Sequence, residues 1–363
     1  MRARTPPRGR RRGPPPVGAG VLTDGRWPPL RRRAAPRGLS PAVRSPTVSR
    51  PRTSVVVPTY RGAHRLPALL DGLAAQSDDD LEVVIAVDGD VDGSAAVVEA
   101  RTDLPVRAVV LPRNQGRSAA LNAGFAAARG ELLVRCDDDL ELSPGYVAAH
   151  VAAHASARVG VIGPCRNVYD DTAYARVFGT DADQRLLQAQ LSAGPETAWR
   201  FWGGNVSVTR EDQERVGEYD HRTFDRYGWE DADWGYRLWR TGCPVVVDPR
   251  AWAVHHGAAI SAATRAGRAF DSGWSQALFE RKHDLDLDQR GAAPHSPWQR
   301  LVSRYADGLD AAEVRRRGER ADDHLARWPR YLARKRVALL VEAAARSGYL
   351  SATRSATERT PTP

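Results

Sequence analysis

Short apolar runs and amphipathic segments alternate along the chain from residue 53 onward. The apolar runs have the length and content of buried strands, and they cover residues 53–60, 82–87, 106–111 and 132–136. The segments after the first three runs have helical character, over residues 64–76, from Ser94 onward and over 118–129. Ser143 followed by Pro144 then predicts a further helix start, with the serine as its cap. Strands that alternate with helices predict an α/β fold with a mostly parallel sheet and right-handed crossovers.

The second half of the chain has a more mixed pattern. A loop that enters a strand, a helix that Gly242 stops and another strand are expected over residues 201–209, 227–242 and 244–247. Beyond about Arg290, apolar residues at helical spacing are interleaved with arginines over 298–308, 311–328 and 331–345. These patterns predict a main domain over residues 53–290 and a helical extension over 291–363.

Carboxylates gather where the predicted strands end. Asp88 follows the second strand, and Asp137, Asp138 and Asp139 follow the fourth. In a parallel sheet, ligands bind beyond the carboxyl ends of the strands, so we expect these side chains to meet at one edge. Adjacent carboxylates repel one another unless cations or hydrogen-bond donors compensate them, and a divalent metal that holds a diphosphate would do so. The alternative for the triplet is a solvated acidic turn.

The charge of the chain is unevenly distributed. The 363 residues carry a net charge of +9, but residues 1–52 hold 14 arginines and the single acid Asp24, a local balance of +13 that leaves −4 for the remainder. Eleven of the 25 prolines also lie in this stretch, which has no apolar periodicity. It is therefore expected to be disordered, because it cannot bury enough apolar surface to offset the entropy of ordering.

Neither a membrane span nor a disulfide framework is indicated by the sequence. No apolar run approaches the length that spans a bilayer, and the arginine-rich start lacks the apolar segment of a signal peptide. A cytoplasmic protein is therefore expected. The cysteines, Cys136, Cys165 and Cys243, lack metal-ligand spacing and lie in or beside predicted strands, so buried free thiols are expected.

A second group of acids and aromatic residues lies around residue 230. Glu230 and Asp231 lie at the start of a predicted helix, where acids interact favourably with the helix dipole. This account does not explain the flanking Trp229 and Trp234. Aromatic faces beside carboxylates suit a sugar-binding wall, in which rings stack on C–H surfaces and acids accept hydroxyl hydrogens.

Two pairs of histidines bear on a metal site. His255 and His256 are adjacent on a predicted extended segment, where neighbouring side chains point to opposite faces, so at most one can reach a metal at the Asp triplet. The alternative is a partly buried histidine that is hydrogen-bonded to backbone. His150 and His154 have i,i+4 spacing, but Val151 stands where the helical zinc motif has glutamate, and we interpret this pair as one face of a helix.

Four motifs in fixed order carry a family resemblance, namely residues 55–60, 87–94, 114–124 and the triplet 137–139. Over about residues 53–260, the chain resembles a family 2 glycosyltransferase, which implies the GT-A fold. The resemblance implies that the nucleoside lies against Pro58, Thr59 and Tyr60. It further implies that Asp88, or Asp90 in its place, reads the pyrimidine imide and that Asp138 approaches the ribose. Asn114 and Asn122 are either donor contacts or part of a loop with tight helix packing, and both alternatives are open.

The same resemblance implies a cofactor and a reaction. A divalent metal, Mn2+ or Mg2+, would lie between Asp137, Asp139 and His255. Asp231 would be the base that activates the acceptor and Glu230 would orient an acceptor hydroxyl, although the two roles could be exchanged. The acceptor would contact Trp202, Gly203, Gly204, Asn205 and Trp229. The implied reaction moves a sugar, with inversion, from a UDP- or dTDP-sugar to a hydroxyl of a glycan, lipid-linked or small-molecule acceptor. Residues 53–145 would then be the nucleotide-sugar-binding half and residues 146–290 the acceptor half.

Two other classes of function compete with this interpretation. A sugar-1-phosphate nucleotidyltransferase also uses strand-end carboxylates and a metal, but it usually has a glycine-rich basic loop after the first strand, which residues 58–65 lack. Binding of nucleic acid through the arginine-rich tail is the other, and the −4 balance of the remaining chain argues against nucleic acid as a specific partner. Peripheral contact of the tail with a membrane surface stays open if the acceptor is lipid-linked.

Overall fold

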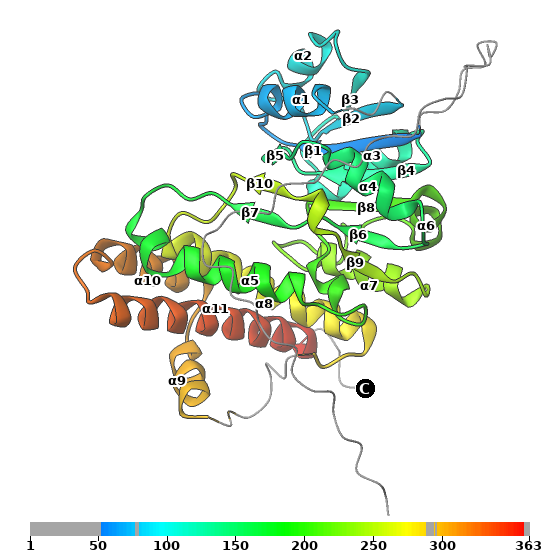
Figure 1. Ribbon diagram of the computed structural model, residues 1–363. Coiled ribbons are helices and arrows are strands. Elements are labelled where there is room, and N and C mark those ends of the chain that lie inside the picture. The colour runs from blue at the N-terminus through cyan, green and yellow to red at the C-terminus, as the bar shows by residue number, and fades with distance from the viewer. Residues whose placement is uncertain (1–51, 77–79, 288–293, 295, 359–363) are drawn as a thin grey trace, which may run out of the picture. The chain divides into compact units, whose positions relative to one another are not determined.

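The computed structural model describes residues 52–76, 80–287, 294 and 296–358 (Figure 1). These residues belong to one unit, Ser49–Pro363. The tail predicted over residues 1–52 lies outside the described residues apart from Arg52, so its disorder stays a prediction. Within the described part of the chain, no helix is both long enough and apolar enough to cross a membrane.

A seven-stranded sheet forms the core of this unit, in the order β3-β2-β1-β4-β8-β6-β9. Its strands are β1 (Thr53–Thr59), β2 (Leu81–Val87), β3 (Val106–Val110), β4 (Leu132–Cys136), β6 (Gly160–Ile162), β8 (Asn205–Thr209) and β9 (Val245–Val247). The pairs β3–β2, β2–β1, β1–β4 and β6–β9 are parallel, whereas β8 is antiparallel to both β4 and β6. The mostly parallel sheet that the sequence predicts is therefore confirmed.

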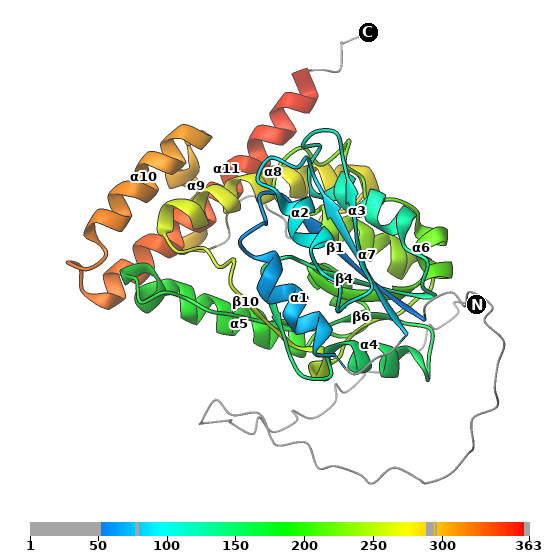
Figure 2. The ribbon, with the colours of Figure 1, turned by 90° about the horizontal axis from the view of Figure 1, so that it is seen from above.

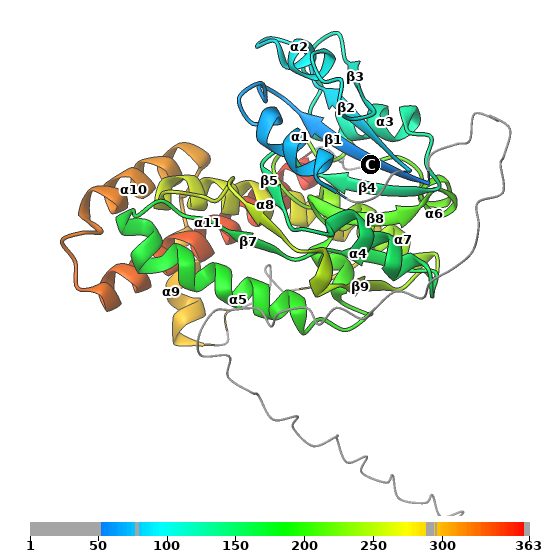
Figure 3. The same ribbon diagram turned by 45° about the horizontal axis from the view of Figure 1, so that its top comes forward.

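Helices cover both faces of this sheet. Val55 and Val57 of β1 pack on the face covered by α1 (Leu66–Ala74), α2 (Ser94–Glu99) and α4 (Tyr146–His154). Val56 points to the other face, which α3 (Arg117–Ala127) and α7 (Glu230–Arg240) cover. Figure 3 shows α1 and α3 on opposite sides of β1. All seven residues of β1 are buried, as expected of a central parallel strand between two layers of helices.

A second sheet of three short strands brings distant segments together. β10 (Ala253–His255) pairs antiparallel with β5 (Leu140–Leu142) and parallel with β7 (Cys165–Asn167). In this register His255 lies opposite both Leu140 and Asn167. The backbone N–H of His256 also donates to the carbonyl oxygen of Asp139 at 3.0 Å. The last residue of the Asp triplet is thereby held beside His255.

The C-terminal part of the described chain is helical. α8 (Ala262–His283) packs with α9 (Pro297–Ala306), α10 (Ala311–His324) and α11 (Arg330–Glu358) through two apolar clusters, and Figure 2 shows α8, α10 and α11 close together at one side of the sheet. One cluster also includes Tyr174 and Phe178 of the segment that leads through η1 (Ala175–Gly179) into α5 (Thr180–Leu191). The three predicted C-terminal helices are confirmed, whereas α5 and α8 were not predicted. The domain boundary at residue 290 stays a prediction.

The helix start predicted at Ser143 and Pro144 is wrong. α4 begins at Tyr146, and its N-cap residue Gly145 has a left-handed backbone with φ of 78°. The Ser143 hydroxyl is buried without a hydrogen-bond partner, so it does not cap the helix. The reason is that residues 140–142 pair with β10, and the backbone must first leave that strand through a turn, in which the Tyr146 N–H donates to the Ser143 carbonyl at 3.1 Å.

Candidate functional site

Two neighbouring cavities lie at the edge of the sheet where β1, β2 and β4 end. The smaller cavity, of about 310 Å3, is lined by those strand ends and by the start of α3. The larger cavity, of about 860 Å3, is lined by residues from β7 and α5 through to α8. Asp137 and Arg117 line both cavities. The strand-end residues therefore lie together, as the sequence predicts, and Asp137 marks the place where the two cavities meet.

The smaller cavity contains most of the residues proposed from the sequence to bind a nucleotide sugar, namely Pro58, Thr59, Tyr60, Asp88, Asn114 and Asp138. Asp88 is 3% exposed, and its carboxylate accepts hydrogen bonds from the backbone N–H groups of Gln115 (2.7 Å) and Gly116 (2.8 Å). Asp88 thus fastens the loop before α3 to the end of β2.

Two of the proposed donor-binding residues lie outside the walls of both cavities. Asp90 is exposed. Asn122 donates to the Tyr219 carbonyl (2.9 Å) and accepts from the Tyr219 N–H (2.8 Å), so it fastens α3 to the loop that precedes α7. These contacts of Asn122 match the packing alternative.

Asp138 is anchored across the smaller cavity. Its carboxylate accepts hydrogen bonds from the Thr59 hydroxyl (2.6 Å) and from Arg65 (2.7 Å). Burial raises the pKa of Asp138, and these two hydrogen bonds oppose that rise. Gly62 is required beside this group, because a Cβ there would lie 1.9 Å from the Thr59 hydroxyl oxygen and 2.7 Å from Asp138 Oδ2.

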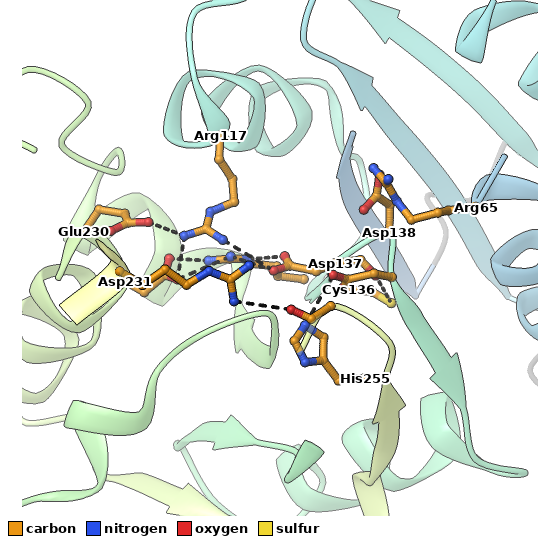
Figure 4. Close-up of polar contacts among 12 residues, drawn as sticks. Arg65, Arg117, Cys136, Asp137, Asp138, Glu230, Asp231 and His255 are labelled. Carbon is orange, nitrogen blue, oxygen red and sulfur yellow. Dashed lines mark hydrogen bonds and ion pairs between the residues drawn. The ribbon is translucent and has the colours of Figure 1, made fainter. Parts of the chain in front are cut away.

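A cluster of two arginines and three carboxylates lies where the cavities meet (Figure 4). Arg135 of β4 is its centre, with a side chain that is 0% exposed. Its Nε donates to Asp137 Oδ1 at 2.9 Å, and its terminal nitrogens donate to the carboxylate of Asp231 on α7. Burial alone raises the pKa of Asp137, but the charges of Arg135 and Arg117 outweigh it and hold that pKa below its ordinary value. Arg135 thus joins the Asp triplet to the predicted base.

Arg117, at the start of α3, is the second cation of the cluster. It pairs with Glu230, lies 3.5 Å from Asp231 Oδ2 and 3.8 Å from Asp137 Oδ2. Burial and repulsion from Asp231 raise the pKa of Glu230, and its Oε2 is buried without a hydrogen-bond partner. Asp231 lines the larger cavity, whereas Glu230 lines neither cavity. The two adjacent acids therefore occupy different environments.

Asp139 and His255 are the predicted metal ligands that the structure leaves available. Asp139 Oδ1 is buried without a hydrogen-bond partner, and Oδ2 lies 3.2 Å from His255 Nε2. Asn167 donates its amide N–H to Asp183, so its oxygen accepts from His255 Nδ1, which leaves Nε2 to face Asp139. The Asp139 oxygen and the His255 nitrogen both carry lone pairs, so at 3.2 Å they require a proton or a cation between them.

The predicted metal site fits two protein ligands better than three. Asp137, the third predicted ligand, is already bound by Arg135. Within the described part of the chain, no three His, Cys, Asp or Glu side chains converge as a metal-binding group. Hard divalent cations commonly take only one or two protein carboxylates and complete their coordination with phosphate and water, so Asp139 and His255 could hold one.

All residues proposed to contact an acceptor line the larger cavity, namely Trp202, Gly203, Gly204, Asn205 and Trp229. The Gly204 carbonyl accepts from the Asp137 N–H at 2.9 Å, and a Cβ at Gly204 would lie 2.4 Å from Asp137 Oδ2. Trp229 has φ of 71°, a costly conformation for a bulky residue, directly before Glu230. Trp234 differs from the expectation: it is 1% exposed and stacks on Trp202 with ring centres 5.1 Å apart, so it belongs to the core.

A buried hydrogen-bond network holds Asn205, the last of the residues 202–205 that line the larger cavity and that are here called the acceptor loop. Asn205 donates to the Ala251 carbonyl (2.8 Å), so its side-chain oxygen accepts from Tyr146 (2.8 Å) and from His150 Nε2 (3.0 Å). His150 Nδ1 then accepts from the Ser207 hydroxyl (2.8 Å). Burial lowers the pKa of His150 to about 4, so the imidazole is neutral at neutral pH. His150 and His154 share one helix face, as predicted, and both contact Ser207.

Two family models match the chain along the segments that build these cavities. Residues 54–211 match the model of glycosyl transferase family 2, and residues 185–253 match the model described as the N-terminal domain of galactosyltransferase. The first segment contains every residue that lines the smaller cavity. Residues 54–211 therefore belong to glycosyl transferase family 2. The family membership predicted from the four motifs is therefore confirmed.

The relatives of this chain differ in what their names describe. Over 233 residues, the chain is 31% identical to a validoxylamine A glucosyltransferase from Streptomyces hygroscopicus subsp. jinggangensis. This alignment covers 56% of this chain and 55% of that protein. Over 129 residues, the chain is 36% identical to an undecaprenyl-phosphate 4-deoxy-4-formamido-L-arabinose transferase from Pseudomonas fluorescens. This alignment covers 34% of this chain and 38% of that protein. The matches thus span about half of the length of these relatives or less.

A solved structure supports the fold. The mannosyltransferase PcManGT from Pyrobaculum calidifontis, in complex with GDP-Man and Mn2+, aligns with a TM-score of 0.53 and 23% identity over 82% of this chain and 87% of that chain. The predicted GT-A fold is confirmed by this likeness together with the observed sheet.

The arginines of the site are not predicted from the sequence. Arg65, Arg117 and Arg135 each bind an acid that the sequence indicates as a site residue. Arg135 carries a detectable signal, because an arginine inside the apolar run 132–136 must be paired if that run is a buried strand. Arg65 and Arg117 lie at helix starts and have no comparable signal in the sequence.

Proposed function

We propose that this chain transfers a sugar from a nucleotide diphosphosugar to an acceptor hydroxyl, with inversion at the anomeric carbon. The nucleotide would occupy the smaller cavity, where Asp88 and Asp138 face the positions of base and ribose. The acceptor would occupy the larger cavity, beside Trp229 and Asp231. This division corresponds to a nucleotide-sugar-binding half over residues 53–145 and an acceptor half over residues 146–290.

The observation that carries this proposal is that the two cavities meet at Asp137 and Arg117, with Asp231 beside them. A transferase must hold two substrates with their reacting atoms in contact, and this accounts for much of its rate enhancement. Two adjoining cavities with one cluster of charges at their junction meet this requirement. A single closed pocket would not.

Asp231 is the base in this proposal because it lines the larger cavity and Glu230 does not. The ion pair with Arg135 fixes the orientation of the Asp231 carboxylate. The acceptor hydroxyl donates its proton to Asp231 while its oxygen attacks the anomeric carbon, and the diphosphate leaves from the opposite face of the sugar. Glu230 binds Arg117 and thereby holds that arginine at the junction.

A divalent cation, Mn2+ or Mg2+, is part of the proposal. Asp139 and His255 would hold it, supported by the unpartnered Asp139 Oδ1 and by the Asn167 hydrogen bond that orients the imidazole. When bound, such a cation would act as a Lewis acid toward the charge that grows on the leaving diphosphate. The Pyrobaculum structure, which contains GDP-Man and Mn2+, has the same classes of ligand.

The range of acceptors in this proposal follows the names of the relatives. One relative is named for a lipid phosphate and another for the small molecule validoxylamine A. We therefore include glycan, lipid-linked and small-molecule acceptors in the proposal. A peripheral contact with the inner face of a membrane belongs to it only for a lipid-linked acceptor.

A thermal-shift panel tests the proposed function. UDP-, dTDP- and GDP-sugars are each added with and without Mn2+, together with the corresponding nucleoside monophosphates as controls. A ligand that binds only the native state stabilises it by RT ln(1 + [L]/Kd), so at equal concentration the preferred nucleotide diphosphosugar should raise Tm most, and more so with Mn2+. Nucleotide release that depends on an acceptor should follow for that donor. If instead the protein converts a nucleotide sugar and pyrophosphate into a nucleoside triphosphate and a sugar 1-phosphate, it is a nucleotidyltransferase and the proposal fails.

A further inference from the structure

The larger cavity contains cations that the proposed reaction does not use. The charged residues that line it are five arginines and three aspartates, namely Arg117, Arg185, Arg200, Arg265 and Arg268 with Asp137, Asp183 and Asp231. Arg117 is engaged by Glu230 and lies near two of the aspartates. The excess positive charge therefore lies away from the junction, and two of its members, Arg265 and Arg268, are on α8.

Neither of these α8 arginines has an ion-pair partner in the described part of the chain. The side chain of Arg265 forms no hydrogen bond or ion pair there, and only its backbone N–H donates, to the Ser261 carbonyl at the start of the helix. Arg268 donates to the Gly257 carbonyl at 3.3 Å, and its guanidinium lies 5.5 Å from the centre of the Tyr227 ring. Arg265 lies in the first turn of α8 and Arg268 in the second. Cations near the start of a helix interact unfavourably with its dipole, so these positions do not stabilise α8 by themselves.

The start of α8 is not itself a free anion site. Asp322 of α10 accepts hydrogen bonds from the backbone N–H groups of Ala262 (2.8 Å) and Ala263 (3.0 Å). The Asp183 carboxylate in this part of the larger cavity is also engaged, because it accepts from the Asn167 amide. The guanidinium groups of Arg265 and Arg268 are therefore the donors available to a ligand.

Tyr174 adds a polar group to this part of the cavity. The residue is 3% exposed and its ring packs in the apolar cluster with α10 and α11, yet it lines the larger cavity. Its hydroxyl is not among the buried atoms of the described residues that lack a hydrogen-bond partner, so it is open to the cavity. Burial raises the pKa of Tyr174, the charges of Arg265 and Arg268 oppose that rise, and the charge of Asp322 adds to it.

We propose that Arg265, Arg268 and Tyr174 form a subsite for a phosphate group in the larger cavity. Guanidinium forks and a neutral O–H group are the donors that match the oxygens of a phosphate. Arg265, Arg268 and Tyr174 line the larger cavity only. The phosphate is therefore assigned to the acceptor, an assignment that rests on the function proposed above. The diphosphate of the donor is the other source of the same chemistry.

Three variants of the full-length chain address this subsite. Arg265→Gln and Arg268→Gln each remove one charge, and Tyr174→Phe removes the hydroxyl while keeping the ring in its apolar cluster. Arg304→Gln on α9 is the matched control, because that arginine is exposed and lies outside both cavities. Tm values of all four, compared with wild type, show that each variant is folded before any titration.

Calorimetry then measures two affinities for each protein in the presence of Mg2+. One is the Kd of the preferred nucleotide diphosphosugar. The other is the Kd of inorganic phosphate, titrated onto the protein alone and onto protein saturated with the matching nucleoside diphosphate. Each arginine variant should weaken phosphate binding roughly tenfold or more, Tyr174→Phe by a smaller factor, and Arg304→Gln not at all. Donor affinity should stay within about twofold throughout.

The outcomes separate the subsite from the proposed function. If the arginine variants weaken donor binding and saturation with nucleoside diphosphate blocks phosphate, the subsite stands and holds the donor diphosphate. If wild type binds phosphate as expected but no nucleotide sugar, the proposed function fails and the subsite stands. If wild type does not bind phosphate, or if all variants bind it as Arg304→Gln does, the subsite is wrong.

Discussion

The two cavities that meet at Asp137 are built in different ways. The smaller cavity is lined by residues between Pro58 and Asp139, from strand ends, the loops that follow them and the start of α3. The larger cavity is lined by residues that extend from Arg117 to Ser272 and come from β7, α5, α7, β10 and α8 among other elements. The smaller cavity is therefore formed by a local pattern that is repeated along the sheet. The larger cavity is formed by segments that are distant in the chain.

This difference matches where the family models end. The family 2 model covers residues 54–211 and the galactosyltransferase model covers residues 185–253, so both end before α8 begins at Ala262. The smaller cavity is thus built from segments that the family shares, whereas part of the larger cavity is built from a helix beyond both models. On the proposed function, the donor cavity lies within the family 2 segment, and we propose that acceptor selection depends on α8, which lies beyond both models.

The largest expected effect comes from Asp231→Asn, which should disable the larger cavity while leaving the smaller one intact. Loss of the proposed base should reduce transfer roughly 10²- to 10⁴-fold. The donor should still bind with nearly unchanged Kd, because Asp231 does not line the smaller cavity. Nucleotide release in the presence of acceptor and calorimetric donor binding measure the two quantities. The exposed Asp225→Asn is the control, and a transfer rate for Asp231→Asn equal to that of wild type would remove Asp231 as the base.

Arg135→Met should break the link between the cavities and unfold the protein more easily. The side chain is 0% exposed, and its removal leaves Asp137 and Asp231 without their main cation. Removing one partner of a buried ion pair typically costs about 3–5 kcal/mol of unfolding free energy. Chemical denaturation measures this loss, and Arg107→Met on β3, a position with a side chain that is 36% exposed, should cost much less. Similar losses for the two variants would show that Arg135 is not central to the cluster.

The sequence predicts the smaller cavity better than the larger one for a physical reason. The carboxyl ends of parallel strands must meet at one edge, so the apolar runs that end at Asp88 and Asp137 suffice to bring these residues together. Asp231 and His255 reach the same place only through pairing of β4 with β8 and of β5 with β10. No periodicity in the chain specifies which short strands pair, and their positions at the site were implied by family resemblance alone.

The arginines of the site show a second limit of prediction from the sequence. From the sequence, the Asp triplet needs a cation and a metal is predicted, whereas the structure supplies Arg135 to Asp137 and Arg65 to Asp138. Arg265 and Arg268 were also missed, because α8 was not predicted and nothing in its sequence indicates that it faces a cavity. A carboxylate run indicates that positive charge is needed, but only tertiary structure decides whether arginine or metal provides it.

His150 tests the support behind the acceptor loop through the pH dependence of stability. Burial lowers the pKa of His150 to about 4, whereas an unfolded histidine has its ordinary pKa of 6.5. As pH falls from 6.5 toward 4, the unfolded chain binds a proton that the native state does not, so stability is lost over that window. At pH 5 the loss is about 2 kcal/mol. Denaturation at pH 7 and pH 5 should show that His150→Gln lacks this share of the decrease. An identical decrease in both proteins would contradict the buried neutral histidine.

Asp139→Ala tests the smaller cavity through donor binding, and of the four predicted substitutions it should have the smallest effect. Asp139 lines the smaller cavity and its Oδ1 is unpartnered, so its loss should remove the gain in donor affinity that Mn2+ provides. We expect a roughly tenfold or greater rise in donor Kd with Mn2+, and no change after chelation. Glu141→Ala, with a side chain that is 69% exposed, is the matched control on β5. Donor binding that keeps its full dependence on Mn2+ in Asp139→Ala would move the cation elsewhere.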